Sequence, residues 1–238
     1  MIVDRLVETH CHILPGIDDG SPDVETSVKM IKKLQAQGCE AIILTPHYYS
    51  DSISYDDFVQ QRDASLNELK AALGYDAPKL IPAAEVYITK YLFNYDSLEK
   101  LTIGNTRYAL IEHPFSCGFG ESTYDRLLNL DYEYHIKPIL AHIERYPALM
   151  ENPELLDDYI EMGCLVQVNV SSFAEGRKSF RKRLFHYLET GRIHLLGSDC
   201  HNLTSRPPDY SAGLKEIEEK CGKEAIEVLT RNARLLVE

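Results

Sequence analysis

The sequence has no tryptophan, no C-x-x-C motif and no long hydrophobic run. Because no apolar stretch approaches the ~20 residues that a membrane-spanning helix needs, we expect no membrane span. Residues 1–5 carry no basic segment leading into a long apolar one, so we expect no export signal. The six cysteines are widely spaced, which indicates reduced thiols in a cytoplasmic protein.

Basic residues are also scarce, with 25 Lys and Arg against 37 Asp and Glu and a net charge of −12. This balance argues against general binding of nucleic acid, which needs a basic surface. An anionic substrate is still compatible with the charge, because metal ions and a few arginines can reverse the field locally. The chain is long enough to bury a sizeable core, and without a visible linker or repeat we expect residues 1–238 to form a single domain.

Short apolar runs alternate with amphipathic helical patterns along the chain. The expected strands cover residues 6–9, 41–44, 79–84, 108–111, 138–141, 165–170 and 193–197. The pairs Ser21-Pro22 and Asn152-Pro153 predict the starts of two helices, with the polar residue as N-cap. Residues 86–106 fit neither pattern and receive no assignment. The alternation is typical of an α/β protein with a parallel sheet.

Histidine and acidic residues follow directly after most of these apolar runs. They are His10, His12, His47, Glu85, Glu112, His142, Asp199 and His201, and Asp19 lies on the loop that follows the first run. Each alone would be interpreted as a solvated polar residue, but random placement does not put so many at successive strand ends. The carboxyl ends of strands meet at one face of a barrel, whereas in an open sheet they spread along a line. Candidate ligands at so many strand ends can share one site only if the ends meet, so we predict a (β/α)7 barrel, distorted because it has seven units instead of eight. Imidazoles and carboxylates without thiolates indicate a multinuclear site for Mn, Fe or Zn.

Six segments carry motifs that, taken in order, resemble a known superfamily. They are H-C-H-I-L-P-G-I-D-D-G, T-P-H, A-A-E, A-L-I-E-H, A-H-I-E-R-Y, and S-D-C-H-N followed by R-P-P. The chain resembles the polymerase-and-histidinol-phosphatase (PHP) superfamily and, more closely, its bacterial capsular-polysaccharide tyrosine phosphatases. The resemblance extends from His10 to Pro208. It implies a distorted seven-stranded barrel that holds three metal ions, usually manganese.

The resemblance also implies how the candidate ligands are shared among the metals. One metal would be held by His10, His12, Glu85 and Asp199, the second by Glu85, Glu112 and His142, and the third by Asp19, His47 and His201. Glu112 is favoured over its neighbour His113, although either could reach the site. Glu8 departs from the family, in which an aspartate is usual upstream of the histidine pair, and this puts in doubt only a contact around the ligands.

Two arginines, Arg145 and Arg206, lie within a few residues of His142 and His201. A guanidinium group binds phosphate in a planar, bidentate manner, and the resemblance implies this role for both. Asp199 or His201 would assist proton transfer. The implied activity is metal-dependent hydrolysis of phosphotyrosine in proteins. The implied substrate is the tyrosine cluster of a bacterial tyrosine autokinase that controls capsule or exopolysaccharide synthesis.

Three other functions stay open at this point. Cys200 and Arg206 match C-x5-R, the phosphate loop of cysteine-dependent phosphatases, but no glycine lies between them and such matches arise easily by chance. We therefore interpret Cys200 as a structural thiol. Histidinol-phosphate phosphatase is the alternative enzyme, and a metal-binding PHP module without activity is the alternative outside enzymes.

Two further features, a set of tyrosines and a basic segment, are expected to be structural rather than functional. The tyrosines at positions 48, 49, 87, 91 and 95 are expected to be packing or rim residues, although one or two could stack on a substrate phenyl ring. The basic segment 177–183 is expected to be a solvated helix face that could guide an acidic, phosphorylated peptide.

Overall fold

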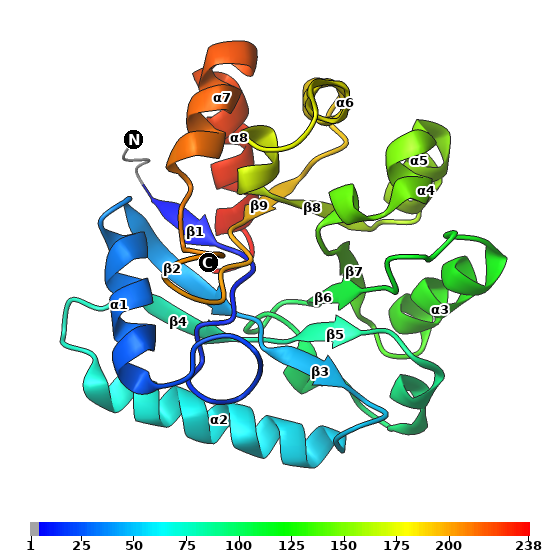
Figure 1. Ribbon diagram of the computed structural model, residues 1–238. Coiled ribbons are helices and arrows are strands. Elements are labelled where there is room, and N and C mark those ends of the chain that lie inside the picture. The colour runs from blue at the N-terminus through cyan, green and yellow to red at the C-terminus, as the bar shows by residue number, and fades with distance from the viewer. Residues whose placement is uncertain (1–4) are drawn as a thin grey trace.

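Strands and helices alternate along the chain, and the helices lie around the outside of the strands (Figure 1). The structure, a computed structural model, describes residues 5–238. The strands are β1 (Leu6–Glu8), β2 (Cys39–Leu44), β3 (His47–Tyr49), β4 (Lys79–Pro82), β5 (Glu85–Tyr87), β6 (Tyr108–Glu112), β7 (Lys137–Leu140), β8 (Leu165–Asn169) and β9 (Leu195–Gly197). The α-helices are α1 (Val24–Gln35), α2 (Tyr55–Ala72), α3 (Glu121–Tyr132), α4 (Pro147–Glu151), α5 (Pro153–Glu161), α6 (Lys178–Glu189), α7 (Ser211–Cys221) and α8 (Lys223–Arg234).

All paired strands run parallel, in the orders β1-β2-β4 and β3-β5-β6-β7-β8-β9. The second and third expected strands correspond to β2 and β4, and each is followed after a short break by a further strand, β3 or β5, which the sequence patterns did not predict. Proline, which has no N–H donor, lies at both breaks, as Pro46 and Pro82. Hydrogen bonds from Ala83 N–H to Leu44 C=O (2.9 Å) and from Glu85 N–H to Pro46 C=O (3.0 Å) bridge the breaks.

The last strand segment meets the first one. Cys11 and Cys200 form an isolated parallel bridge, in which His12 N–H donates to the Cys200 carbonyl at 2.9 Å. Asp199 N–H donates to the His10 carbonyl at 2.7 Å. The prediction of an α/β protein with parallel sheets is confirmed. A closed barrel is not confirmed, because the paired strands form two separate sheets.

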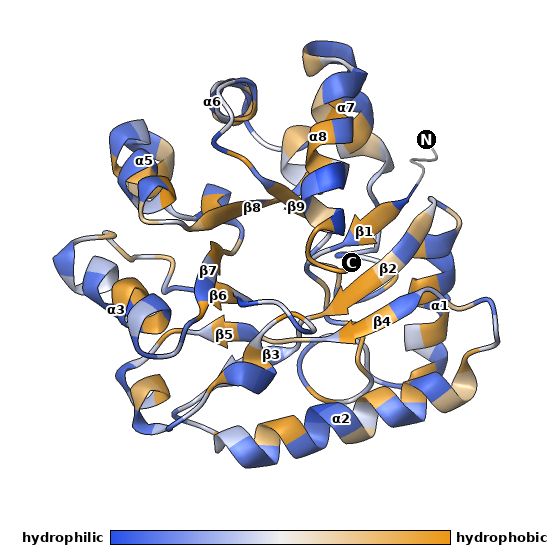
Figure 2. Cartoon of the chain, turned by 180° about the vertical axis from the view of Figure 1, so that it is seen from behind, coloured by the Kyte–Doolittle hydropathy of each residue, from blue (hydrophilic) through white to orange (hydrophobic). Residues whose placement is uncertain are grey.

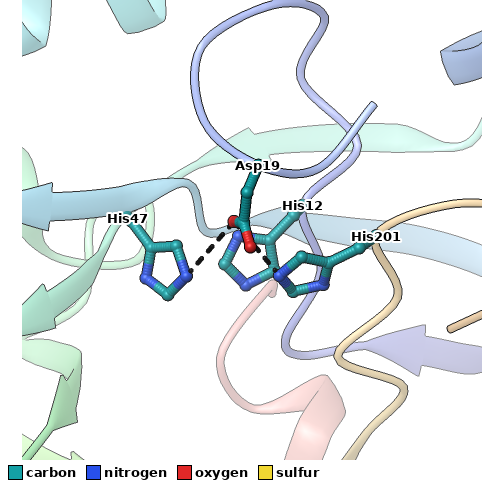
Figure 3. Close-up of side chains that lie close together, drawn as sticks. All are labelled: His12, Asp19, His47 and His201. Carbon is teal, nitrogen blue, oxygen red and sulfur yellow. Dashed lines mark ion pairs between the residues drawn. The ribbon is translucent and has the colours of Figure 1, made fainter. Parts of the chain in front are cut away.

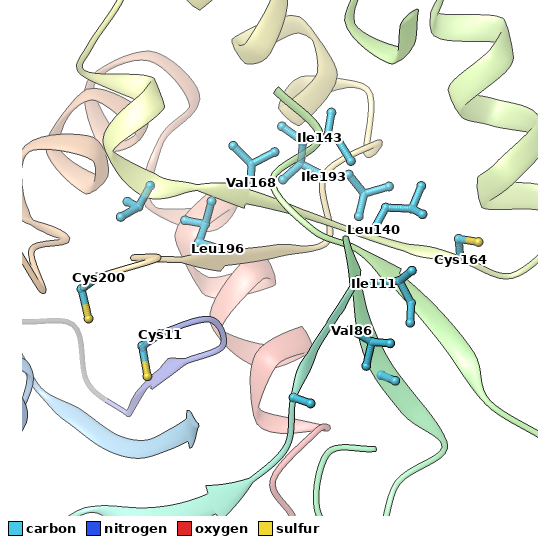
Figure 4. Close-up of a cluster of buried hydrophobic side chains, with 14 of the residues drawn as sticks. Cys11, Val86, Ile111, Leu140, Ile143, Cys164, Val168, Ile193, Leu196 and Cys200 are labelled. Atoms are coloured by element: carbon cyan, nitrogen blue, oxygen red, sulfur yellow. The ribbon is translucent and has the colours of Figure 1, made fainter. Parts of the chain in front are cut away.

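Strand alternation divides the core into two parts. On β2, Ile42 and Leu44 belong to a large cluster between strands and helices, whereas Ala41 and Ile43 belong to a smaller cluster on the other face. Figure 2 shows the hydrophobic colouring along β2 and β4 and the mixed colouring of the surrounding helices. Figure 4 shows part of the large cluster, including Cys11 and Cys200. Polar residues that share the face of the smaller cluster therefore point away from the large cluster.

The predicted helix start at Asn152-Pro153 is confirmed, since the Asn152 side chain accepts a hydrogen bond from Leu155 N–H. The start predicted at Ser21-Pro22 is wrong. Asp23 is the N-cap of α1 and accepts from Thr26 N–H at 2.8 Å. Ser21 is instead buried, where its hydroxyl donates to the Asp23 carbonyl. The proline did not suffice to locate the cap, because the Ser21 hydroxyl is buried and bonded elsewhere, whereas the Asp23 carboxylate can accept from the first turn.

The unassigned residues 86–106 contain β5 and two short 3-10 helices, Lys90–Asn94 and Glu99–Leu101. The six cysteines are all free, as predicted. Within residues 5–238, none of the helices combines the length and apolar character needed to cross a membrane. The basic segment 177–183 lies at the start of α6, and Arg177, Lys178, Lys182 and Arg183 are exposed.

Candidate metal centre

The nine predicted side chains come together at one edge of the strands. Ligand atoms lie within 4.8 Å of one another in three overlapping groups. The first group is His10, His12 and Glu85, with Asp199 beside it; the second is His47, Glu85 and Glu112, with His142 beside it; and the third is His12, Asp19, His47 and His201. The sequence analysis placed His47 and Glu85 at the ends of strands. In the structure they are instead the first residues of β3 and β5, where they pair in register after the breaks. The strand breaks thus present these two side chains to the centre.

The first group joins the two ends of the chain. His10 Nε2 lies 3.2 Å and His12 Nε2 3.3 Å from Glu85 Oε2. Both nitrogens also lie 3.5 Å from Asp199 Oδ1. All four side chains are buried. Their arrangement agrees with the first ligand set that the resemblance implies.

The second group surrounds Glu85 and Glu112. His142 Nε2 lies 2.9 Å from Glu85 Oε1 and 3.5 Å from Glu112 Oε1. His47 Nδ1 lies 3.1 Å from Glu85 Oε2 and 3.8 Å from Glu112 Oε2. His47 therefore reaches this group as well as the third, which the ligand sets did not foresee.

The third group is drawn in Figure 3, where the side chains of His47 and His201 lie on either side of Asp19. Asp19, on the loop before α1, has a side chain that is 67% exposed. Its Oδ1 lies 3.4 Å from His201 Nε2 and 3.6 Å from His47 Nε2. His12 lies beside them, with its ring centroid 3.9 Å from that of His201. An exposed acidic side chain at the edge of the group suits a ligand that completes the group when an ion binds.

Glu112 and His113 point to different surroundings. Glu112 joins the second group, whereas the His113 ring packs against Phe119 at 4.8 Å and Tyr146 at 6.1 Å. The two ring nitrogens of His113 are buried without a hydrogen-bond partner in the described structure. Burial in this aromatic environment lowers the pKa of His113 to about 3. The geometry thus favours Glu112 as the candidate ligand.

Asp18 supports two of the histidines, and the sequence analysis missed it. Its Oδ2 lies 2.8 Å from His12 Nδ1 and accepts from His47 N–H at 3.1 Å. A carboxylate at Nδ1 fixes the proton there and leaves Nε2 free to face the centre. Burial alone would raise the pKa of Asp18, but the interactions with His12 lower it to about 2. The signal available in the sequence was the first aspartate of the Asp-Asp-Gly loop.

Gln167 and Asn169 of β8 support the first group and were also missed as functional residues. Gln167 Oε1 accepts from His142 N–H at 2.7 Å and lies 3.2 Å from His10 Nδ1. Gln167 Nε2 donates to Asn169 Oδ1, and Asn169 Nδ2 donates to Asp199 Oδ2 at 2.9 Å. Their alternation with buried valines was visible in the sequence, and it places both amides on the face that carries the ligands.

Glu8 joins the first and last strands beneath the site. Its Oε1 accepts from the backbone N–H groups of His10 and Ser198, each at 3.0 Å, and from the Tyr210 hydroxyl at 2.9 Å. Burial raises the pKa of Glu8 above its usual value. This residue therefore holds backbone next to the ligands, and its hydrogen bonds reach the backbone of His10 rather than a ligand side chain.

Backbone strain and close packing accompany the ligands. His142 and Asp199 have φ angles of 32° and 52°, in the left-handed region that is unfavourable for residues other than glycine. Gly197 allows β9 to approach the site, because a Cβ there would lie 2.6 Å from His10 Cβ and 2.8 Å from Gln167 Nε2. The surrounding structure must hold these conformations, as is common at functional sites.

The donor set fits bound cations. Glu85 Oε2, His47 Nδ1, His142 Nδ1 and His201 Nε2 are buried without a hydrogen-bond partner among the described residues. Four carboxylates, those of Asp19, Glu85, Glu112 and Asp199, share one site, and their mutual repulsion calls for positive charge between them. Imidazole and carboxylate donors without thiolate are those that Mn, Fe and Zn accept.

The charged state of the site also favours ligation. Burial alone would raise the pKa of Glu85, but His10, His12 and His142 hold it well below its usual value. Burial would lower the pKa of His142, yet its hydrogen bonds to Glu112 and Glu85 raise it to about 9. Burial and the neighbouring His12 lower the pKa of His201 to about 4. Glu85 is therefore ionised, and His142 carries a proton that a cation would displace.

Arg145 and Arg206 meet at one oxygen of Asp199. Each guanidinium Nη2 lies 2.6 Å from Asp199 Oδ2, whereas the other carboxylate oxygen, Oδ1, lies near His10 and His12. Both arginines are about one-third exposed and line a cavity of about 430 Å³. Its other lining residues are Asp19, His47, Tyr49, Glu85, Tyr87, Glu112, His113, Pro114, Phe115 and Asp199. Two cations at the mouth of the candidate metal centre are suited to an anionic substrate.

Cys200 does not line this cavity. Its side chain is fully buried in the large hydrophobic cluster together with Cys11 (Figure 4). The interpretation of Cys200 as a structural thiol is therefore confirmed.

The comparisons with known proteins cover the whole of this arrangement. The family model for capsular polysaccharide synthesis, CpsB/CapC, matches residues 6–238. The chain belongs to the CpsB/CapC family. A relative named tyrosine-protein phosphatase CpsB, from Streptococcus agalactiae serotype V, is 31% identical over 98% of each chain. The predicted membership of the capsular-polysaccharide phosphatase family is thus confirmed.

Solved structures agree with this assignment to the CpsB/CapC family. One is from work on YwqE of Bacillus subtilis and CpsB of Streptococcus pneumoniae, which are described as unique metal-dependent tyrosine phosphatases. It matches with a TM-score of 0.82 and 29% identity over 97% of this chain and 94% of the solved one. The phosphotriesterase homology protein of Escherichia coli matches with a TM-score of 0.55 and 12% identity over 96% of both chains, which shows similarity of fold alone.

Proposed function

We propose that this CpsB/CapC family member is a metal-dependent phosphatase that hydrolyses phosphotyrosine in proteins. The observation that carries the proposal is the shared cavity, in which the candidate metal ligands and two arginines face the same space. The printed names of full-length relatives as tyrosine-protein phosphatases support the choice of phosphotyrosine.

We propose three metal ions, with manganese as the native metal and Fe or Zn as alternatives. The three overlapping groups of donor atoms support the number three. His10, His12, Glu85 and Asp199 would hold the first ion, Glu85, Glu112 and His142 the second, and Asp19, His47 and His201 the third. When bound, such ions would supply Lewis acidity and positive charge for the attack of water on phosphorus.

The arginines would bind the phosphoryl group. Arg145 and Arg206 rest on Asp199 Oδ2 and are partly exposed, so a phosphate that enters the cavity can take over their N–H donors. Their charge would then stabilise the oxygens on which negative charge develops in the transition state. Tyrosine, with a pKa near 10, leaves as a comparatively stable phenolate, so a proton supplied through Asp199 or His201 would assist only modestly.

We also propose the wider setting of this activity. The substrate would be a bacterial tyrosine kinase that regulates capsule synthesis, as the family name suggests. Six free cysteines support a cytoplasmic location. The contacts between the first and last strand segments support one distorted seven-unit barrel and a single domain over residues 1–238.

The test is hydrolysis of a phosphotyrosyl peptide by the purified protein. We expect turnover to be lost in EDTA and to return when Mn²⁺ is added. Arg145→Lys is the matched variant, because it keeps the charge and removes the bidentate geometry, and we expect about 10- to 100-fold lower kcat/KM. Turnover that is indifferent to EDTA would overturn the metal-dependent mechanism. Turnover of histidinol phosphate without turnover of the peptide would overturn the choice of substrate.

A further inference from the structure

The cavity has two chemically different parts. Its inner part is charged and carries the arginines and the candidate ligands. Its remaining lining is aromatic or apolar and consists of Tyr49, Tyr87, Pro114 and Phe115. A phosphate group and an attached phenyl ring differ in the same way, since the first needs cations and the second needs apolar contact.

Phe115 is the most exposed member of the aromatic part. It lies three residues after the end of β6, and 54% of its surface is exposed. Its ring lies 5.8 Å from the Arg145 guanidinium carbon and 6.0 Å from the ring of His142. Because Phe115 contacts a phosphate-binding arginine, an organic group attached to a phosphate held by Arg145 must lie near this ring. Nothing else in the described structure covers the exposed side of the ring.

Tyr49 and Tyr87 form the facing part of the lining. They are paired in register on β3 and β5, so they project to the same side of the sheet, with ring centroids 5.4 Å apart. The Tyr49 ring also lies 5.3 Å from that of His47. The other candidate tyrosines do not line the cavity: Tyr48 packs in the core against Phe58, and Tyr95 packs against Tyr55.

We infer that Phe115, with the Tyr49–Tyr87 pair, is the binding site for the phenyl ring of the substrate and selects aryl over alkyl phosphates. The inference rests on the proposed function and names the specificity determinant of the same cavity. A phenyl ring stacked on Phe115 removes apolar surface from water and adds an aromatic contact. A phosphoserine side chain offers no ring and leaves Phe115 exposed.

The experiment measures binding, by calorimetry, of phenylphosphonate and methylphosphonate to the metal-loaded protein. Both probes carry the same anionic group, and only one carries the ring. We expect Phe115→Ala to weaken phenylphosphonate binding by about tenfold and methylphosphonate binding by less than about twofold. Phe115→Tyr should restore the preference. Tyr132→Ala is the matched control, because Tyr132 is 73% exposed on α3 and lies outside the cavity.

The outcomes separate this inference from the proposed function. Equal weakening of both probes in Phe115→Ala, or of neither, would overturn the role of Phe115. If wild-type protein fails to hydrolyse a phosphotyrosyl peptide in Mn²⁺ while Phe115 still determines the preference for phenylphosphonate, the proposed function fails and the aryl site stands. If the peptide is hydrolysed with the same KM by wild type and Phe115→Ala, the function stands and the inference fails.

Discussion

Replacing Gln167 by leucine is expected to weaken Mn²⁺ binding through residues that Gln167 positions. The side chain is fully buried, and its Oε1 serves both the His142 N–H and His10 Nδ1. Leucine has a similar volume but no acceptor, so the His10 ring loses the partner that keeps its proton on Nδ1 and its Nε2 toward Glu85. His142 at the same time loses the hydrogen bond that holds its strained backbone.

The structure sets the size of both effects. Removing a hydrogen-bond partner around metal ligands typically costs 10- to 100-fold in metal affinity, so we expect about that range for Mn²⁺. The His142 N–H is left buried without an acceptor, which costs about 1–3 kcal/mol in the free energy of unfolding. A variant with both losses would show that the same amide serves stability and the site.

Mn²⁺ affinity is measured by titration of the EDTA-treated protein, followed by the EPR signal of the free ion, and stability by urea unfolding without metal. Val166→Ala is the matched control. Val166 precedes Gln167 on β8, is equally buried and points into the large cluster, so its loss costs about 2 kcal/mol without contact to the ligands. A Gln167→Leu protein that is destabilised like Val166→Ala but binds Mn²⁺ like wild type would refute the reasoning.

Two further substitutions test the packing around the site. Cys200→Ala should keep phosphotyrosine turnover within about threefold of wild type and lower the free energy of unfolding by about 1–2 kcal/mol, because the thiol only fills the core. Loss of turnover while the fold and the bound metal stay intact would contradict this prediction. Gly197→Ala should lower the free energy of unfolding by about 1–3 kcal/mol and weaken Mn²⁺ binding, because its Cβ would overlap His10 and Gln167. Urea unfolding and metal titration measure the two effects. Wild-type values in both would contradict the prediction and show that the backbone can shift to make room for the methyl group.

The sequence predicted the members of the site better than their neighbours. Histidines and carboxylates after apolar runs were sufficient to find His10 or Asp199, because parallel strands bring their carboxyl ends to one edge. The amide partner of His10 is 157 residues away on another strand, and local patterns contain no information on that pairing. Asp18 was overlooked because a loop rich in aspartate and glycine is by itself typical of any turn.

The predicted boundaries of strands and helices were wrong for a different reason. The breaks after Leu44 and Pro82 depend on where each proline falls relative to the hydrogen-bonding partner strand, which a single run of residues does not reveal. Asp23 displaced Ser21 as N-cap because the deep burial of Ser21 is set by tertiary contacts, among them the hydroxyl of Ser27.

Glu112 and His113 were the one pair between which the sequence could not decide, and strand alternation supplies the physical test. On β6, Leu110 belongs to the smaller cluster and Ile111 to the large one, so Glu112 follows the first face and His113 the second. Glu112→Gln should weaken Mn²⁺ binding by at least about tenfold, since it removes a charged donor. His113→Leu, of similar volume, should leave Mn²⁺ affinity unchanged in the same titration.

His113→Leu should also change the response to acid. The pKa of His113 is about 3 in the folded chain and near 6.5 when unfolded, so between these values only the unfolded chain takes up the proton. Its contribution therefore destabilises the metal-free protein as pH falls below 6.5, by up to about 1.4 kcal/mol per pH unit. Urea unfolding in EDTA at pH 7 and pH 5 should show a smaller loss for His113→Leu than for wild type. Reduced Mn²⁺ affinity together with an unchanged acid response would instead make His113 the ligand, and Glu112 its neighbour.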